Sequence, residues 1–227
     1  MSRNETIADK GIWTAKKRYI LNAYDIEGVR FAEPKLKIMG IEAVKSSTPA
    51  PCRQKIKDAL KVIMTKTNDD LIQFIEEFRN EFRKMNPEEI AFPRGVNNLG
   101  KFSSTETIYG KCTPIHVRGS LLYNYYIRKH KLTNKYPVIQ EGEKIKFIFL
   151  RTPNKINENI ISFIQEFPKE LGLDKYIDHD LQFEKSFLEP LKTILDTIGW
   201  KTEKINTLEF LFAWIFYKML WRRLVMN

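Results

Sequence analysis

The sequence contains few of the side chains that build metal sites and disulfide frameworks. Two cysteines and three histidines occur among 227 residues. Cys52 and Cys112 lack the paired spacing of a zinc site and are too few for a disulfide framework. We therefore expect no metal to be bound by this chain, and a reducing, cytoplasmic environment suits it.

Other common functional signals are also missing. The sequence has no Gly-rich phosphate loop and no nucleophile elbow. The pair His179 and Asp180 is only a weak match to a metal phosphohydrolase, because acidic residues there also suit a helix N-terminus. Residues 1–5 are polar without a signal-peptide pattern, and the apolar run 210–217 is shorter than the ~20 residues that cross a bilayer. No catalytic residue is predicted, and a membrane partner is not favoured.

Positive charge and apolar residues are both abundant. The 38 Lys and Arg residues outnumber 28 acidic ones, which gives a formal charge of +10 and an isoelectric point near 9.4. Hydrophobic residues make up 43% of the chain and aromatic residues 12%, enough for a folded core. A folded basic protein favours nucleic acid or an anionic surface as its partner.

The first third of the chain predicts strands followed by helices. Residues 1–12 are predicted as a loop, and residues 15–25 and 29–41 as two strands joined by the turn 25–28. At the start of the first strand, three cations and an aromatic residue stand together at a sheet edge, where they suit a polyanion. They are Lys16, Lys17, Arg18 and Tyr19.

A helix is predicted from Pro49 to about Lys66. Its candidate N-caps are Ser46, Ser47 and Thr48, with Pro49 at the first helical position. Free backbone amides and the positive end of the helix dipole would then suit a phosphate. Arg53, Lys57 and Lys61 recur every four residues on one face, which is either a solvated face or a contact to a duplex backbone.

The rest of the chain predicts mainly helices with a small β element. A second helix begins with Asn68 as its cap, and residues 87–114 form a long irregular segment. A third helix covers about Val117–Lys131 and buries Leu121, Leu122 and Tyr125. Strands are expected at 144–151 and 160–164. The last long helix spans about 178–198, with a kink at Pro190 and a stop at Gly199. The predicted class is α+β.

Several of these stretches resemble the end of the palm and the thumb of family B DNA polymerases, in particular those of T-even-type bacteriophages. The resemblance extends over most of residues 10–212. The matching stretches are 16–19, 25–28, 34–40, 45–49, 115–119, 142–148, 176–178 and 188–191. Family B polymerases bind two metal ions through palm aspartates, one of them in a Tyr-Gly-Asp-Thr-Asp type turn, and this sequence has no such turn.

The resemblance implies a division of the chain and a set of partners. Residues 1–44 would be the end of the palm, 45–200 the thumb, 201–212 a clamp-binding-like peptide and 213–227 an apolar and basic extension. The partners would be primer-template DNA, a sliding clamp, and an N-terminal polymerase fragment with the exonuclease and palm, in which Mg²⁺ is expected. This chain would then be the thumb-containing part of a split or truncated polymerase, active only with the palm carboxylates.

The resemblance also implies site residues. Lysines matching the family's basic motif reach the minor groove and backbone near the primer terminus, and His116 and Arg118 match a thumb pattern beside the duplex. The implied DNA-binding residues are Lys16, Lys17, Arg18, Tyr19, Lys45, Ser46, Ser47, Thr48, Arg53, Lys57, His116 and Arg118. The implied clamp-binding residues are Leu208, Phe210, Leu211 and Phe212.

Two other functions stay open at this point. One is a DNA-binding or clamp-binding module without enzymatic activity. The other is a peripheral membrane protein that uses residues 210–226 as an amphipathic anchor. Residues 213–227 could equally form an interfacial basic helix, form a packed terminal helix, or arise from an altered reading frame.

Overall fold

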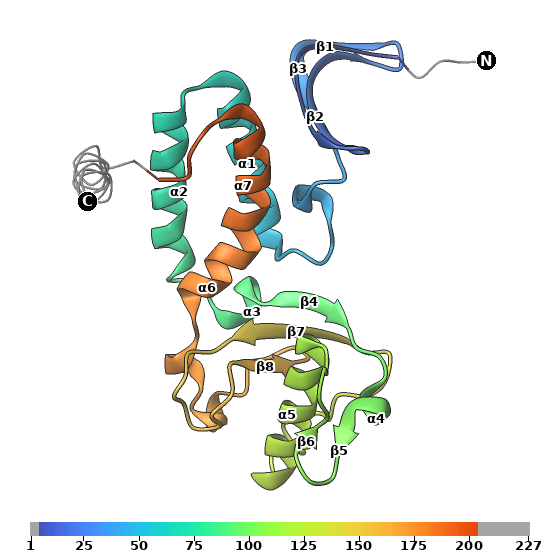
Figure 1. Ribbon diagram of the computed structural model, residues 1–227, viewed down its shortest axis with the longest axis vertical. Helices are drawn as coiled ribbons and strands as arrows, with labels where there is room; N and C mark the ends of the chain where they lie inside the picture. Colours follow the sequence, from blue (N-terminus) through green and yellow to red (C-terminus); the bar gives the residue numbers. More distant parts are fainter. Residues whose placement is uncertain (1–4, 204–227) are drawn as a thin grey trace, which may run out of the picture.

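The computed structural model describes residues 5–203 and places them in two parts along the long axis of the molecule (Figure 1). One part holds a three-stranded sheet beside the long helices, and the other holds a second three-stranded sheet covered by one helix. Helices and strands are both abundant, so the α+β class is confirmed. None of the helices within 5–203 is long and apolar enough to span a bilayer.

The first sheet is antiparallel with the order β1-β2-β3, comprising β1 (Thr6–Ala15), β2 (Arg18–Ile26) and β3 (Val29–Met39). The predicted loop at residues 1–12 is wrong for the residues from Thr6 onward. Two register shifts around Ala8 interrupt the period-two pattern of β1 and hide the strand in the sequence. The expected two-stranded hairpin therefore gains a third strand, which a marginal hairpin needs.

Two helices follow as an antiparallel pair, after a 3₁₀ turn at Glu42–Val44: α1 (Ala50–Thr65) and α2 (Asn68–Phe82). The predicted cap of α2 is wrong by one residue. Thr67 is the N-cap, and its side chain and the Asp70 carboxylate form a reciprocal capping box. The hydroxyl of Thr67 also donates to Asp70 at 2.7 Å, and these hydrogen bonds lower the pKa of that carboxyl.

The expected final helix is interrupted. It consists of α6 (His179–Phe183), a π-helical turn (Glu184–Leu188) and α7 (Glu189–Ile198). Pro190 has no N–H and its ring crowds the carbonyl four residues earlier, so a wider turn just before it accommodates the ring. The predicted stop at Gly199 is confirmed, with φ of +72° at the C-cap.

The second sheet has the order β4-β7-β8 and is antiparallel. It comprises β4 (Phe92–Gly95), β7 (Lys144–Phe149) and β8 (Ile160–Phe163), and α5 (Ile115–Lys129) packs on it. Residues 87–114 are therefore not irregular throughout. Besides β4 they hold α3 (Pro87–Ile90), α4 (Leu99–Phe102), β5 (Ser103–Ser104) and β6 (Ile108–Tyr109). Two 3₁₀ turns follow β8, at Lys169–Leu171 and Asp174–Tyr176.

Close packing of α5 on β8 depends on a glycine. A Cβ on Gly119 would lie 2.6 Å from the Ser162 Oγ and 3.1 Å from the Ser162 backbone nitrogen. On the same helix Tyr123 is buried, whereas Tyr125 is 42% exposed, so the prediction of a buried Tyr125 is wrong. Position 125 is rotated about the helix axis relative to position 122. The Tyr125 side chain therefore lies beyond the edge of the helix face that β8 covers.

We expect Gly119→Ala to lower the free energy of unfolding by about 1–3 kcal/mol, because backbone atoms of β8 must move to admit the methyl group. Chemical denaturation at neutral pH measures this change. Gly100→Ala is the matched control, because Gly100 lies in α4 and a Cβ added there would meet no atom within 4 Å. Alanine also has a higher helix propensity than glycine, which by itself would stabilise either variant. Equal stability of the two variants would contradict the packing argument.

Candidate nucleic-acid interface

The Lys16–Lys17 pair forms the tip of a tight turn between β1 and β2, and the prediction that it lies on a strand is wrong. Lys17 has φ of +62°, a left-handed conformation. Gly40 lies directly against the Lys17 carbonyl, so a side chain at position 40 would collide with the turn. Both lysines are exposed, and neither forms an ion pair within residues 5–203. The turn therefore holds two uncompensated cations outward on a fixed backbone.

Arg18 and Lys45 share one carboxylate. The Arg18 Nη2 donates to Glu42 Oε2 at 2.9 Å and to Oε1 at 3.2 Å, and the Lys45 Nζ donates to Oε1 at 2.8 Å. This cluster ties β2 to the 3₁₀ turn that leads into α1. Because its charges are partly compensated, Arg18 and Lys45 have less to gain from a phosphate than Lys16 and Lys17. Tyr19 is half-buried within the sheet.

The N-terminus of α1 differs from its prediction. Pro49 is the N-cap, no side chain caps the helix, and Thr48 is 5% exposed. Ser46 and Ser47 precede this cap without bonding to the first turn. Proline also occupies position 51, so the first three helical residues offer only the amides of Ala50 and Cys52. The terminus is therefore a poorer phosphate site than its sequence suggests.

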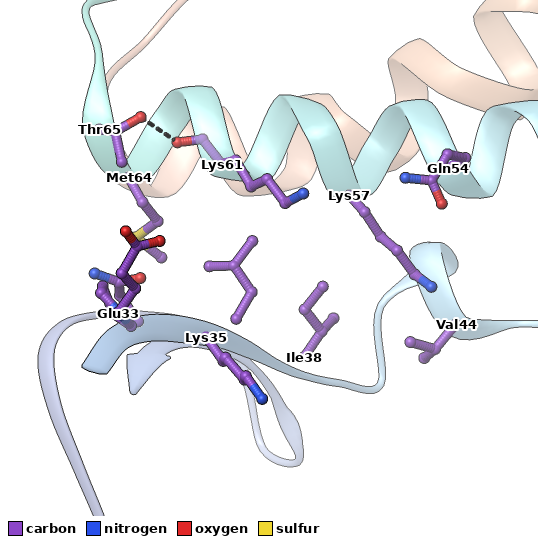
Figure 2. Close-up of a pocket in the computed structure, with 12 residues that line it drawn as sticks. Glu33, Lys35, Ile38, Val44, Gln54, Lys57, Lys61, Met64 and Thr65 are labelled. Atoms are coloured by element: carbon purple, nitrogen blue, oxygen red, sulfur yellow. Dashed lines mark hydrogen bonds between the residues drawn. The ribbon is translucent and has the colours of Figure 1, made fainter. Parts of the chain in front are cut away.

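A groove of about 880 Å³ runs between β3 and α1 (Figure 2). Lys57 and Lys61 extend into it from α1, and Lys35 lies on β3 at its other side. Apolar side chains such as Ile38 form its floor. Arg53 lies one turn before Lys57, beside Ala43 and Val44. Lys35 is a basic residue that the strand pattern of 29–41 did not single out, because its position across from α1 depends on tertiary packing.

His116 and Arg118 lie on α5, and Figure 1 shows α5 and the first sheet at opposite ends of the molecule. The Arg118 Nη2 donates to the Asn159 side chain, and its guanidinium lies 5.8 Å from the centre of the Tyr109 ring. The Tyr109 hydroxyl in turn donates to Glu158 at 2.6 Å. The structure therefore does not bring these two residues together with the Lys16–Lys17 turn.

The backbone carbonyl of His116 joins two elements of the structure. Its carbonyl accepts hydrogen bonds from Ser120 at 2.8 Å and Ser162 at 3.1 Å, which joins α5 to β8. Burial, and then the nearby Arg94 charge, lower the pKa of the imidazole. The side chain is therefore neutral at pH 7 and adds no charge for a polyanion.

Among residues 5–203, no three His, Cys, Asp or Glu side chains are grouped so that they could hold a metal ion. The candidate clamp-binding residues 208–212 lie outside the described residues. The described residues therefore contain two separate groups of exposed cations. One group lies at the first sheet and α1, and the other lies at α5.

No protein-family model matches the chain. The DNA-directed DNA polymerase of Enterobacteria phage T4 is 34% identical over 207 residues, which cover 89% of this chain and 22% of that protein. The DNA-directed DNA polymerase of Escherichia phage RB69 is 36% identical over 187 residues, which cover 80% of this chain and 20% of that protein. The chain is related to the C-terminal part of T-even-type phage DNA polymerases. It spans about a fifth of the length of these two curated relatives.

We expect two of the three histidines to make stability depend on pH. Burial is the largest cause that lowers the pKa of His116 and of His179, below their ordinary value of 6.5. The unfolded chain thus takes up protons at a higher pH than the folded chain does. We expect the free energy of unfolding to fall between pH 7 and pH 5, and His116→Gln combined with His179→Gln to flatten this slope.

Urea denaturation at several pH values between 5 and 7 measures the slope. That window lies above the lowered pKa values of Asp70 and Asp180, so these carboxylates contribute little to it. His130→Gln, at an exposed position, is the control for replacing a histidine by glutamine. A double variant with the parent slope would show that these half-buried histidines are not the cause.

Proposed function

We propose that this chain is the thumb-containing part of a phage-type DNA polymerase and that it grips the primer-template duplex. The observation that carries the proposal is the relationship to the T4 and RB69 polymerases. The exposed Lys16–Lys17 turn supports it, because uncompensated cations on a fixed backbone suit a polyanion. The division into an end of the palm at 1–44 and a thumb at 45–200 is part of this proposal.

The chain's contribution to catalysis is then alignment. Two Mg²⁺ ions held by palm carboxylates outside this sequence would promote attack of the primer 3′-oxygen on the nucleotide α-phosphate. Lys16 and Lys17 would hold the duplex backbone and the minor-groove edge, where hydrogen-bond acceptors differ little between base pairs. Arg18, through Glu42, keeps their turn in place. A small displacement of a bound primer lowers the reaction rate strongly, so a rigid turn serves this role.

A sliding clamp is a second proposed partner. The support is the sequence alone, since Leu208, Phe210, Leu211 and Phe212 resemble the short aromatic peptide by which phage polymerases hold the clamp. A tethered peptide of this kind acts by raising the effective concentration of polymerase on its template.

We expect the purified chain to incorporate no nucleotides by itself, because it lacks the metal-binding turn. Mixed with the part of phage T4 DNA polymerase that lies outside the match, it should extend a primer, and neither polypeptide alone should do so efficiently. Gel-based primer extension measures this. Extension by this chain alone would contradict the proposal, whereas duplex binding without extension in the mixture would favour the non-catalytic module.

The double variant Lys16→Gln and Lys17→Gln should bind duplex DNA with a weaker salt dependence. Each phosphate contact contributes about −0.9 to the slope of log K against log salt, so the loss of two contacts should make this slope less negative by about 1.8. Fluorescence anisotropy from low to moderate salt measures it, with several unrelated duplex sequences. Lys84→Gln with Lys169→Gln removes the same charge from exposed positions away from the turn. Equal slopes in both double variants would remove the turn from the interface.

A further inference from the structure

One carboxylate lies between two of the cations beside the Lys16–Lys17 turn. Glu42 belongs to the 3₁₀ turn after β3, and its two oxygens accept hydrogen bonds from Arg18 and Lys45. The Glu42 side chain is 21% exposed, whereas that of Arg18 is 32% and that of Lys45 45% exposed. The two cations are therefore more accessible to an anion in solution than is the carboxylate that pairs with them.

The segment that carries Glu42 is anchored in the protein core. Ile41 and Ala43, on either side of Glu42, are both essentially buried. A Cβ added to Gly40 would lie 3.0 Å from the Arg18 Cγ, so the stem of the Arg18 side chain packs against the Gly40 backbone on its way to the carboxylate. Glu42 therefore has a fixed place beside the turn.

Glu42 offers Arg18 and Lys45 the same kind of contact that a DNA phosphate would offer. Within residues 5–203 neither cation has another ion-pair partner. Carboxylate and phosphate oxygens both accept charge-assisted hydrogen bonds from such cations. A phosphate that approaches Arg18 or Lys45 must therefore displace the carboxylate or share the cation with it.

We infer that Glu42 is a positioning residue that competes with DNA phosphates for Arg18 and Lys45. This inference rests on the proposed function. In the free chain the carboxylate holds both cationic side chains beside the Lys16–Lys17 turn. In the complex it limits the affinity for the duplex, since the same two cations cannot gain fully from a phosphate. A grip limited in this way suits a protein that slides along DNA.

The experiment measures binding of the full chain to duplex DNA by fluorescence anisotropy at several salt concentrations. Glu42→Gln should bind about threefold more tightly at low salt, because it removes a competing anion. The slope of log K against log salt should become more negative by about 0.9 to 1.8, since one or two further cations can contact phosphate. A residue that only maintained the fold would weaken binding when it was replaced.

Glu81→Gln is the matched control. The Glu81 carboxylate of α2 accepts from Lys55 of α1 at 2.6 Å, and the Lys55 ammonium lies 5.1 Å from the centre of the Phe78 ring, on the side of α1 that faces α2. This variant therefore removes the same charge and releases a lysine away from the Lys16–Lys17 turn. It should retain a slope close to that of the parent chain.

Lys45→Gln tests the inference even if Glu42→Gln does not fold. Because Glu42 already pairs with Lys45, this variant should change the slope by less than Lys17→Gln, for which about 0.9 is expected. Equal changes in the Lys45 and Lys17 variants would overturn the inference, as would equal slopes in folded Glu42→Gln and in Glu81→Gln. Failure of the parent chain to bind duplex DNA would overturn the proposed grip as well, so the two failures are distinguishable.

Discussion

Four phenylalanines at one joint hold the two parts of the molecule together. Phe78 and Phe82 of α2 meet Phe183 and Phe187 of the interrupted final helix, with ring centres 4.8 to 5.8 Å apart. All four are essentially buried. Such edge-to-face and tilted contacts add to the burial of large apolar area, so this joint fixes α2 against the last helices.

Polar contacts complete the joint. The buried Gln182 side chain donates to the Ile90 carbonyl at 2.7 Å and accepts from the Phe149 amide at 3.2 Å, which links α6 to both α3 and β7. Nearby, the Cys52 thiol donates to the Ser186 hydroxyl, and burial raises the pKa of that thiol to about 11. The joint between the two parts is therefore packed, and it holds the Lys16–Lys17 turn and Arg118 apart.

The basic residues of this chain have different tasks. Arg18, Lys45 and Arg118 already bond to Glu42 or Asn159, and they position the segments that carry them. Lys16 and Lys17 have no such partner within the described residues. An uncompensated cation gains more from a phosphate than a paired one, so the turn, where two such cations are adjacent, supports the proposed grip better than Arg18 or Lys45 does.

The sequence by itself determined the long helices, the α+β class and the relationship to phage polymerases, because period-3.6 stripes, turn residues and contiguous motifs are local signals. Only the tertiary structure decided which cations have partners, since the Glu42 carboxylate pairs with Arg18 and the uncharged Asn159 side chain accepts a hydrogen bond from Arg118. It also placed Lys16–Lys17 in a turn, since register shifts hide the strand pattern of β1 in the sequence. Alternation along a strand assigns its side chains to two faces, but only packing decides which of these faces the chain itself buries.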